Sequence, residues 1–443
     1  MKRYFFLFLI LLLSTYISAD SHLMPLSLEK ALELGIKNSR QLQISRSQSI
    51  VAEANYHETG TYLLPSLRFS ASALSLSEEQ PFEVDLSSLI PGLSRIQLGE
   101  SITHSYSLRF SVQQPLFTGM KLINARRAAR YQSESAEWEV KLAERELKYQ
   151  IESAYWNLYQ AIQIENLINE TILQLQSHLT DIENYLQQGL ATQNEVLKIK
   201  THLSQVLIRQ IEASNTIRLG MNALNSLIGL PLDNELELTS QIISRNIPAD
   251  PLPVMIDYAL HHRPELKSLQ AAIQAGKAGI RIAQSGWWPQ IALIGNYTYA
   301  NPNTRIIPPR DRYDDTWDVG IYLTMDLWNW GLPHHQSVQA KAVLNQVTMG
   351  YRQMEDAITL EVTQDYLNAL KCGQKIKAAR LGVEQAEENY RVTQQKFKNG
   401  IVINSELLDA ETALLSARTA LTQAMVEDEI AGIRLSKSSG QNW

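Results

Sequence analysis

The sequence alternates between polar and apolar residues from His104 to Gln113, which reads HSYSLRFSVQ. Every second residue from Tyr106 to Val112 is apolar, and the residues between them are serine and arginine. A period of two predicts a β-strand with one apolar face and one polar face. A strand of about 10 residues has the length that crosses a bilayer, although a sandwich strand with one buried face shows the same alternation.

The same alternation occurs four times and predicts strands at 66–76, 103–114, 289–300 and 316–327. Aromatic residues lie where the expected strands meet the expected helices, as is typical of the girdles that mark the two faces of a membrane. We therefore interpret the four segments as membrane β-strands, with girdle aromatics at Phe117, Trp287, Trp288, Trp328 and Trp330.

Four strands are too few to close a membrane barrel, because the smallest have about eight. An open sheet edge in lipid would leave backbone groups without hydrogen bonds. The chain is therefore expected to oligomerise. Two copies would give eight strands around a packed interior, and three would give twelve around a lumen lined by the polar face. The segments 75–102 and 300–315 are rich in serine, proline, asparagine and charge, which is typical of external loops.

The sequence contains an internal repeat. Leu42 and Pro65 have counterparts 224 residues later at Leu266 and Pro289, and Gly189 to Leu197 corresponds to Gly400 to Leu408. Such a repeat indicates a duplicated structural unit. We place the two repeats at 26–230 and 253–435, each with a helix, two strands and two very long helices.

Apolar residues recur with spacings of four and three through the long helices, which predicts coiled-coil packing. They include Leu175, Leu179, Ile182, Val196, Ile199, Val206, Leu407 and Ala410. The first long helix, expected from Met120 to Gln188, would be about 100 Å long at 1.5 Å per residue. Gly189 and Gly400 permit the left-handed turn that starts an antiparallel return. The predicted fold is mostly α with β: a long coiled-coil helical barrel continued by a β-barrel that several copies complete.

Residues 1–19 have a basic start, an apolar block and a small residue at the expected cleavage point, as in a secretory signal peptide. A single cysteine, Cys372, excludes an intramolecular disulfide. The net charge of −6 comes from acidic and basic residues that are mixed along the helices, so no basic field indicates a nucleic-acid partner.

Two histidine pairs, His261-His262 and His334-His335, are the only residues that suggest metal ligands. Adjacent histidines project in different directions, and no spaced carboxylate or cysteine cluster completes a site. The sequence also has no phosphate-binding glycine loop and no nucleophile with a paired base. We expect no metal, no cofactor and no enzymatic activity.

The order of these motifs resembles the TolC-type outer-membrane efflux protein family. The resemblance covers nearly the whole chain beyond residue 19 and is carried by Arg263 to Leu266, Trp288 to Ile291, Pro115 to Gly119, and Gly400 with Leu407 to Ala410. It implies a homotrimer in the outer membrane of a Gram-negative bacterium, with a twelve-stranded barrel and a helical tunnel through the periplasm. It also implies docking onto a periplasmic adaptor protein coupled to an inner-membrane pump, so that the chain is a passive duct contacting outer-membrane lipid.

The resemblance assigns the adaptor contacts to the hairpin tips, at Gly189, Leu190, Thr192, Gly400, Ile401 and Ser405. Charged residues at similar heights above the tips suggest a charge-paired gate formed by Asp181, Glu183, Arg391 and Lys396. Solvated helix faces are the simpler alternative, because surface ion pairs usually contribute little. Three carboxylates, Glu384, Glu387 and Glu388, would give the entrance a cation preference.

Two other classes of protein remain open at this point. An exported coiled-coil structural or adhesion protein would contain the helices but leave the strands unexplained. A periplasmic adaptor also carries long hairpins, yet the duplicated strands argue against it. The sequence does not identify the substrate, the pump or the role of the long loop at 75–102.

Overall fold

The computed structural model describes residues 23–78, 83–84, 96–97, 101–242 and 250–441. The expected signal peptide and most of the loop at 75–102 lie outside these residues. The chain divides into two compact units. We call Met1–Arg40, Glu146–Ala249 and Asp365–Leu435 the hairpin unit, and Gln41–Arg145, Asp250–Gln364 and Ser436–Trp443 the sheet unit.

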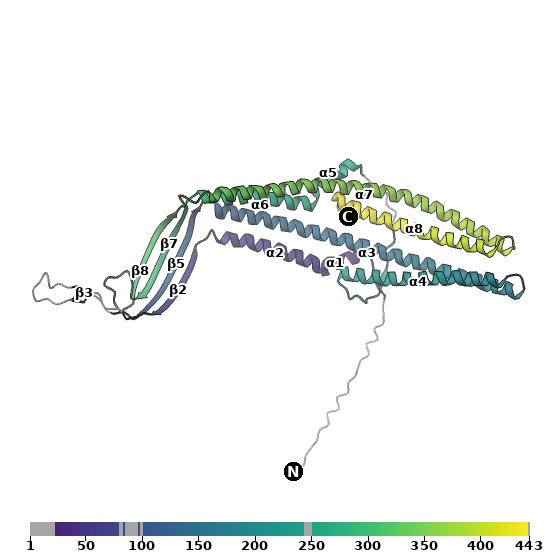
Figure 1. The fold of residues 1–443 in the computed structure, drawn as a ribbon, viewed down its shortest axis with the longest axis horizontal. Helices are drawn as coiled ribbons and strands as arrows, with labels where there is room; N and C mark the ends of the chain where they lie inside the picture. Colours follow the sequence, from purple (N-terminus) through teal and green to yellow (C-terminus); the bar gives the residue numbers. More distant parts are fainter. Residues whose placement is uncertain (1–22, 79–82, 85–95, 98–100, 243–249, 442–443) are drawn as a thin grey trace, which may run out of the picture. The chain divides into compact units, whose positions relative to one another are not determined.

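The sheet unit contains four antiparallel strands in the order β2-β5-β7-β8 (Figure 1). They are β2 (Ser66–Ser75), β5 (His104–Thr118), β7 (Gln290–Asn301) and β8 (Asp314–Thr324). Strand β5 runs four residues beyond the range expected from the alternation, and β8 ends three residues short of it. Phe117 consequently lies inside β5, paired with Ile291, and not beyond the strand end. A short pair, β3 (Glu83–Val84) with β4 (Ile96–Gln97), lies in the connecting segment.

The strand register separates a polar face from an apolar face. Ser111 Oγ donates to Asn296 Oδ1 at 2.8 Å, and Asn296 Nδ2 donates to Asp318 Oδ2 at 2.9 Å, which joins three strands across one row. The adjacent row contains the aliphatic residues Val112 and Val319 at the corresponding positions. Since successive side chains of a strand point to opposite faces, this one-residue step places the two rows on opposite sides of the sheet.

Glycines make the turns from strand to long helix in both repeats. Gly119 has φ +61 and is followed by Met120 at φ +66. Gly331 has φ +75 and follows Trp330 at φ +55. Left-handed backbone is accessible to glycine without steric penalty, which explains why both repeats keep glycine there.

Each repeat enters its strands through two helices where the sequence predicted one. The first pair is α1 (Leu28–Asn38) and α2 (Arg40–Thr61), and the second is α5 (Leu252–His262) and α6 (Pro264–Gln284), followed by the 3-10 turn η1 (Ser285–Trp287). The second break has a simple cause, because the residue before a proline is disfavoured in helical conformation and Arg263 precedes Pro264. The Arg263 side chain is buried and pairs there with Glu265 and Glu361.

The four long helices match in length between the repeats. Helices α3 (Lys121–Gln187) and α7 (Leu332–Lys398) have 67 residues each, and α4 (Gln193–Ile228) and α8 (Asn404–Ser439) have 36 each. Figure 1 shows them as two hairpins, α3/α4 and α7/α8. Within the described residues, no helix combines the length and apolarity that a membrane crossing requires.

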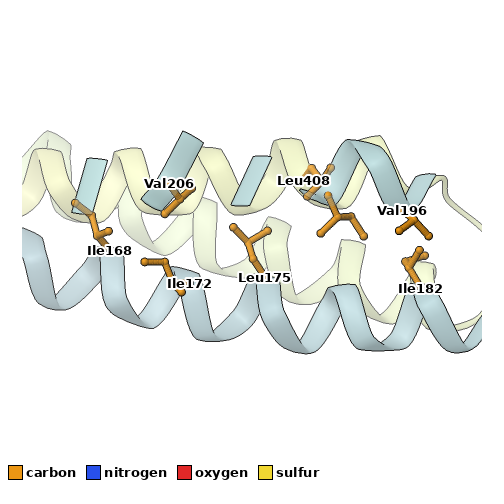
Figure 2. Close-up of a cluster of buried hydrophobic side chains, with 8 residues drawn as sticks. Ile168, Ile172, Leu175, Ile182, Val196, Val206 and Leu408 are labelled. Atoms are coloured by element: carbon orange, nitrogen blue, oxygen red, sulfur yellow. The ribbon is translucent and has the colours of Figure 1, made fainter. Parts of the chain in front are cut away.

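The core of the hairpin unit follows the predicted coiled-coil positions. Leu175 and Ile199 are completely buried, and Ile182, Val196 and Val206 are nearly so (Figure 2). Leu408 of α8 belongs to the same cluster, and Phe397 of α7 packs against it. The second hairpin therefore contributes directly to the apolar core of the first.

A small parallel sheet closes the other end of the hairpin unit. Strand β1 (Met24–Leu26) pairs with β6 (Leu236–Leu238). The buried Tyr155 hydroxyl donates to the Leu26 carbonyl at 2.9 Å and accepts from the Ser240 amide at 3.0 Å. One side chain of α3 thereby ties together two segments that are more than 200 residues apart.

Candidate functional site

The two hairpin tips have the same backbone hydrogen bonds. At the first tip, the Gly189 amide donates to Leu186 O at 3.0 Å and the Leu190 amide to Tyr185 O at 2.8 Å. At the second, the Gly400 amide donates to Phe397 O and the Ile401 amide to Lys396 O, both at 2.9 Å. This is the Schellman ending of a helix, which needs a left-handed residue, and the glycines have φ +75 and +69.

Apolar side chains project from both tips. Leu190 is 74% exposed and Ile401 is 69% exposed. The helix that returns from the first tip starts with a capping box, in which Thr192 and Glu195 satisfy each other's backbone amides. Each tip is therefore a hydrogen-bonded turn that presents an aliphatic residue to the outside.

Polar contacts tie the two hairpins together above the tips. Asn404 Nδ2 at the start of α8 donates to Glu195 O of α4 at 3.2 Å. Further along, the Arg418 guanidinium reaches Glu387 of α7 at 2.8 Å and Glu170 of α3 at 3.4 Å. These contacts join all four long helices within one chain.

A buried polar pair lies between these contacts. His178 of α3 and Glu411 of α8 have side chains that are 6% and 2% exposed, and His178 Nδ1 lies 3.9 Å from Glu411 Oε1. Burial lowers the pKa of His178 to about 4 and raises the pKa of Glu411 to about 7. The Phe397 ring packs edge-on against the imidazole at a centroid distance of 5.1 Å.

The four gate candidates are not brought together within one chain. Glu183 of α3 pairs with Lys200 of α4 at 2.9 Å, inside the first hairpin. Arg391 pairs with Glu388, one turn away on α7, at 2.7 Å. Asp181 and Lys396 are exposed on their helices. A link between the two candidate sets would have to form between neighbouring copies of the chain.

The three entrance carboxylates differ in their surroundings. Glu387 binds Arg418, and Glu388 binds Arg391. The Arg391 guanidinium donates hydrogen bonds to the Glu388 carboxylate, which lowers the Glu388 pKa. Glu384 is exposed on the same helix. Two of the three negative charges are therefore balanced locally by arginine.

The girdle tryptophans are prominently exposed in the sheet unit. Trp287 and Trp288 are 51% and 59% exposed, and Trp328 and Trp330 are 76% and 83% exposed. The last two rings contact each other edge-to-face at 5.7 Å. Large aromatic rings left in contact with solvent at a strand-to-helix junction are suited to the interface between lipid and water.

The histidine pairs are engaged with neighbours on their own helices. His261 Nδ1 lies 2.8 Å from Asp257 O, and the His262 ring stacks on Tyr258 at 3.9 Å. The His334 and His335 rings contact each other edge-on. In the part of the chain that the structure describes, no three His, Cys, Asp or Glu side chains gather as metal ligands.

Sequence reasoning missed His178, Glu411 and Asn404. His178 and Glu411 flank the predicted apolar positions Leu179 and Ala410, where a polar residue is expected to face solvent. The only signal was their place next to the apolar stripe. Their burial follows from the second hairpin lying against the first, which no local pattern encodes.

Comparisons with known proteins agree with this arrangement. The chain is 24% identical over 350 residues to the alkaline protease secretion protein AprF of Pseudomonas aeruginosa, covering 75% of this chain and 69% of that one. It is 20% identical over 427 residues to the probable efflux pump outer membrane protein TtgC of Pseudomonas putida, covering 94% and 83%. The crystal structure of the outer membrane protein VceC from Vibrio cholerae superposes with a TM-score of 0.78 at 18% identity, covering 94% and 96%.

The sequence profile of the outer membrane efflux protein family matches residues 31–230 and 255–441. These two segments include the four strands, both long hairpins and both tips described above. The chain belongs to the outer membrane efflux protein family.

Proposed function

We propose that this chain is the exit duct of a tripartite efflux or secretion system, formed by three copies that share one β-barrel in the outer membrane. The observation that carries the proposal is the sheet of β2, β5, β7 and β8. Its two edge strands, β2 and β8, each pair on one side only and have no second partner strand among the described residues. All ten residues of β2 are exposed in the single chain.

An open sheet of this kind is stable in lipid only if its edges are closed. Each backbone group left without a hydrogen bond in hydrocarbon costs several kcal/mol. Pairing β8 of one copy with β2 of the next satisfies both edges and repeats around an axis. Three copies give twelve strands, whose polar face would line a lumen and whose apolar face would contact lipid. The names of AprF and TtgC, a secretion protein and an efflux pump outer membrane protein, support a role in export.

The native mass of the detergent-extracted protein tests this arrangement. We expect a mass of three chains from the outer-membrane fraction, together with ion conductance after reconstitution into planar bilayers. A monomer or dimer that remains soluble without detergent would contradict the shared barrel and favour the alternative of an exported coiled-coil structural protein.

The hairpin tips are our candidates for contact with a periplasmic adaptor protein, itself coupled to an inner-membrane pump. Exposed Leu190 and Ile401 support this, because aliphatic residues on rigid turns suit a small apolar interface. Thr192 caps the first tip, and Ser405 is half-buried just after the second.

Replacing both aliphatic residues, Leu190→Asp with Ile401→Asp, is expected to weaken adaptor binding by at least tenfold, since each removes apolar contact worth about 1–2 kcal/mol or more. The matched control is Gln188→Asp with Asn399→Asp, which adds the same charge at the same tips and keeps both aliphatic residues. Binding of the purified channel to the adaptor encoded with its pump would be measured by surface plasmon resonance. Equal losses in both double variants would contradict an apolar contact.

The gate proposal places Arg391 opposite a carboxylate of the neighbouring copy when the tunnel is closed. Arg391→Ala is then expected to raise the conductance of the reconstituted channel severalfold, because a link that holds the entrance is removed. Lys377→Ala is the control, since it removes an exposed positive charge elsewhere on α7. Unchanged conductance in the Arg391 variant would reduce the Arg391–Glu388 pair to a contact on the exposed surface of α7.

A further inference from the structure

The contact between the hairpins contains two ionisable side chains that lack hydrogen bonds. His178 has no partner for either ring nitrogen, and Glu411 Oε2 also has none. At 3.9 Å, the nearest approach of the two groups is too long for a hydrogen bond. Both lie beside the apolar cluster of Leu175, Ile182 and Leu408, which supplies no polar atoms.

Such surroundings disfavour a charge on either residue. A buried carboxylate or imidazolium without a hydrogen-bonded partner is strongly destabilised, so each group holds its neutral form beyond its usual pH range. When the imidazole is neutral and the carboxyl is protonated, the two groups together hold one titratable proton. The same two residues exposed to water also carry one proton in mildly acidic solution, because histidine is then charged and glutamate is ionised.

We propose that His178 and Glu411 act as one buried proton-binding pair that keeps the contact between the two hairpins insensitive to pH. The pair joins α3 of the first repeat to α8 of the second, so its protonation acts on the packing of one hairpin against the other. The pair itself does not depend on the function proposed above. Its role, to keep a channel entrance closed in acid and in base, rests on that proposed function.

The charged groups around the pair come from all four long helices. Asp181 on α3 acts on His178, and Tyr390 on α7 lies close enough to Glu411 to have its own pKa raised by burial and by that carboxyl. On α4, His202 lies 3.5 Å from the Thr412 hydroxyl, with Arg209 and Asp409 acting on it in opposite directions.

The two residues act on the contact with opposite signs. Glu411 has its pKa raised from 4.5 to about 7. Its contribution to the stability of the contact between the hairpins is therefore fully present below pH 4.5 and is lost as the pH rises to about 7. His178 has its pKa lowered from 6.5 to about 4, so its contribution is fully present above pH 6.5 and is lost as the pH falls to about 4. Because the two pKa shifts have opposite signs and cover the same pH range, the two effects oppose each other.

The compensation has a purpose in the outer-membrane setting. Water-filled barrels in that membrane pass small ions, so the pH around the helices follows that of the surroundings. A lone buried carboxylate or histidine in the hairpin contact would loosen it in base or in acid. Opposed titration of the two groups removes this dependence without removing the polar residues.

Single variants should expose the hidden pH dependence in opposite directions. His178→Gln leaves the titration of Glu411 uncompensated. The equilibrium constant for closing the contact between the hairpins is then expected to fall on the order of a hundredfold from pH 4.5 to pH 8. Glu411→Gln leaves His178 uncompensated, and the contact should weaken by a similar factor from pH 8 to pH 4.5. The wild type and the double variant with both glutamines should vary far less with pH than either single variant.

Thiol accessibility in the intact channel measures the contact directly. Leu408→Cys, in a chain carrying Cys372→Ala, places the reactive group in the cluster that joins the hairpins, and its maleimide labelling is divided by that of a free thiol at each pH. Opposite slopes in the single variants support the pair. Flat profiles, or slopes of the same sign, overturn it.

The native mass is determined on the same preparations, which separates this proposal from the channel. A mass of three chains with flat single-variant profiles would reject the proton pair and leave the channel intact. Opposite slopes in a protein that does not form trimers would establish the pair and reject the proposed duct. The native mass of the double variant also tests whether glutamine at both positions permits folding.

Discussion

Gly119→Ala is expected to destabilise the folded protein by about 2–5 kcal/mol, well beyond the effect of the equivalent change in the second repeat. At Gly119 a Cβ atom would lie 2.6 Å from the Ser285 carbonyl oxygen and 2.8 Å from the Trp288 Cβ. Backbone cannot move aside as the end of a flexible side chain can. The left-handed φ adds about 1–2 kcal/mol, and the overlap adds about 1–3 kcal/mol.

Gly331→Ala is the matched control, because Gly331 makes the same turn and has φ +75 with nothing within 4 Å of its added Cβ. Only the backbone penalty of about 1–2 kcal/mol applies there. The temperature at which the extracted oligomer dissociates, and the amount of folded protein in the membrane fraction, should fall much further for Gly119→Ala. Equal losses would mean that the approach of the Ser285 carbonyl relaxes without resistance.

Arginine on the apolar face of β2 is expected to prevent stable membrane insertion, whereas arginine on its polar face is expected to be tolerated. Ala71 and Ser72 are adjacent, similarly small and exposed, and they point to opposite sides of the sheet. Ala71 lies in the row of Leu108 and Tyr299, and Ser72 pairs with Ser107. An arginine facing lipid near the midplane costs about 2–4 kcal/mol per chain, and a homotrimer carries three of them.

The comparison of Ala71→Arg with Ser72→Arg therefore tests which face contacts lipid. We expect Ala71→Arg to abolish recovery of the trimer from the membrane fraction. Ser72→Arg should leave the trimer intact and reduce the cation conductance of the channel, since its charge would enter the lumen. The opposite result would mean that the polar face of the sheet points outward, which would contradict the proposed duct.

Local patterns were sufficient for the individual elements. The period of two locates β2, β5, β7 and β8, because the backbone of a strand alternates its side chains whatever surrounds it. The tip glycines mark both helix ends, because the Schellman turn needs a left-handed residue and glycine adopts it freely. The spacings of four and three likewise indicate Leu175, Ile182 and Ile199 as core, since they lie on one helical face.

Local patterns failed where two distant segments meet. Gly119 and Gly331 are equivalent in sequence, yet only Gly119 has the Ser285 carbonyl against it. The gate candidates stand at similar heights above the tips, which suggested that they pair with one another. Glu183 and Arg391 instead pair with neighbours on their own hairpins. A partner that is close on the same helix or hairpin satisfies a charge with little loss of entropy.

The sequence by itself determined the alternation of the strands and the hairpin tips, because each depends on residues that are close together in the chain. It also showed the duplication and the family resemblance, because both are found by comparing stretches of sequence without knowing which surfaces meet. The tertiary structure decided the burial of His178 against Glu411, the crowding at Gly119 and the partners of each charge. His178 and Glu411 lie 233 residues apart in the chain and Gly119 and Ser285 lie 166 apart, and the free energy of such a contact is absent until the chain has folded.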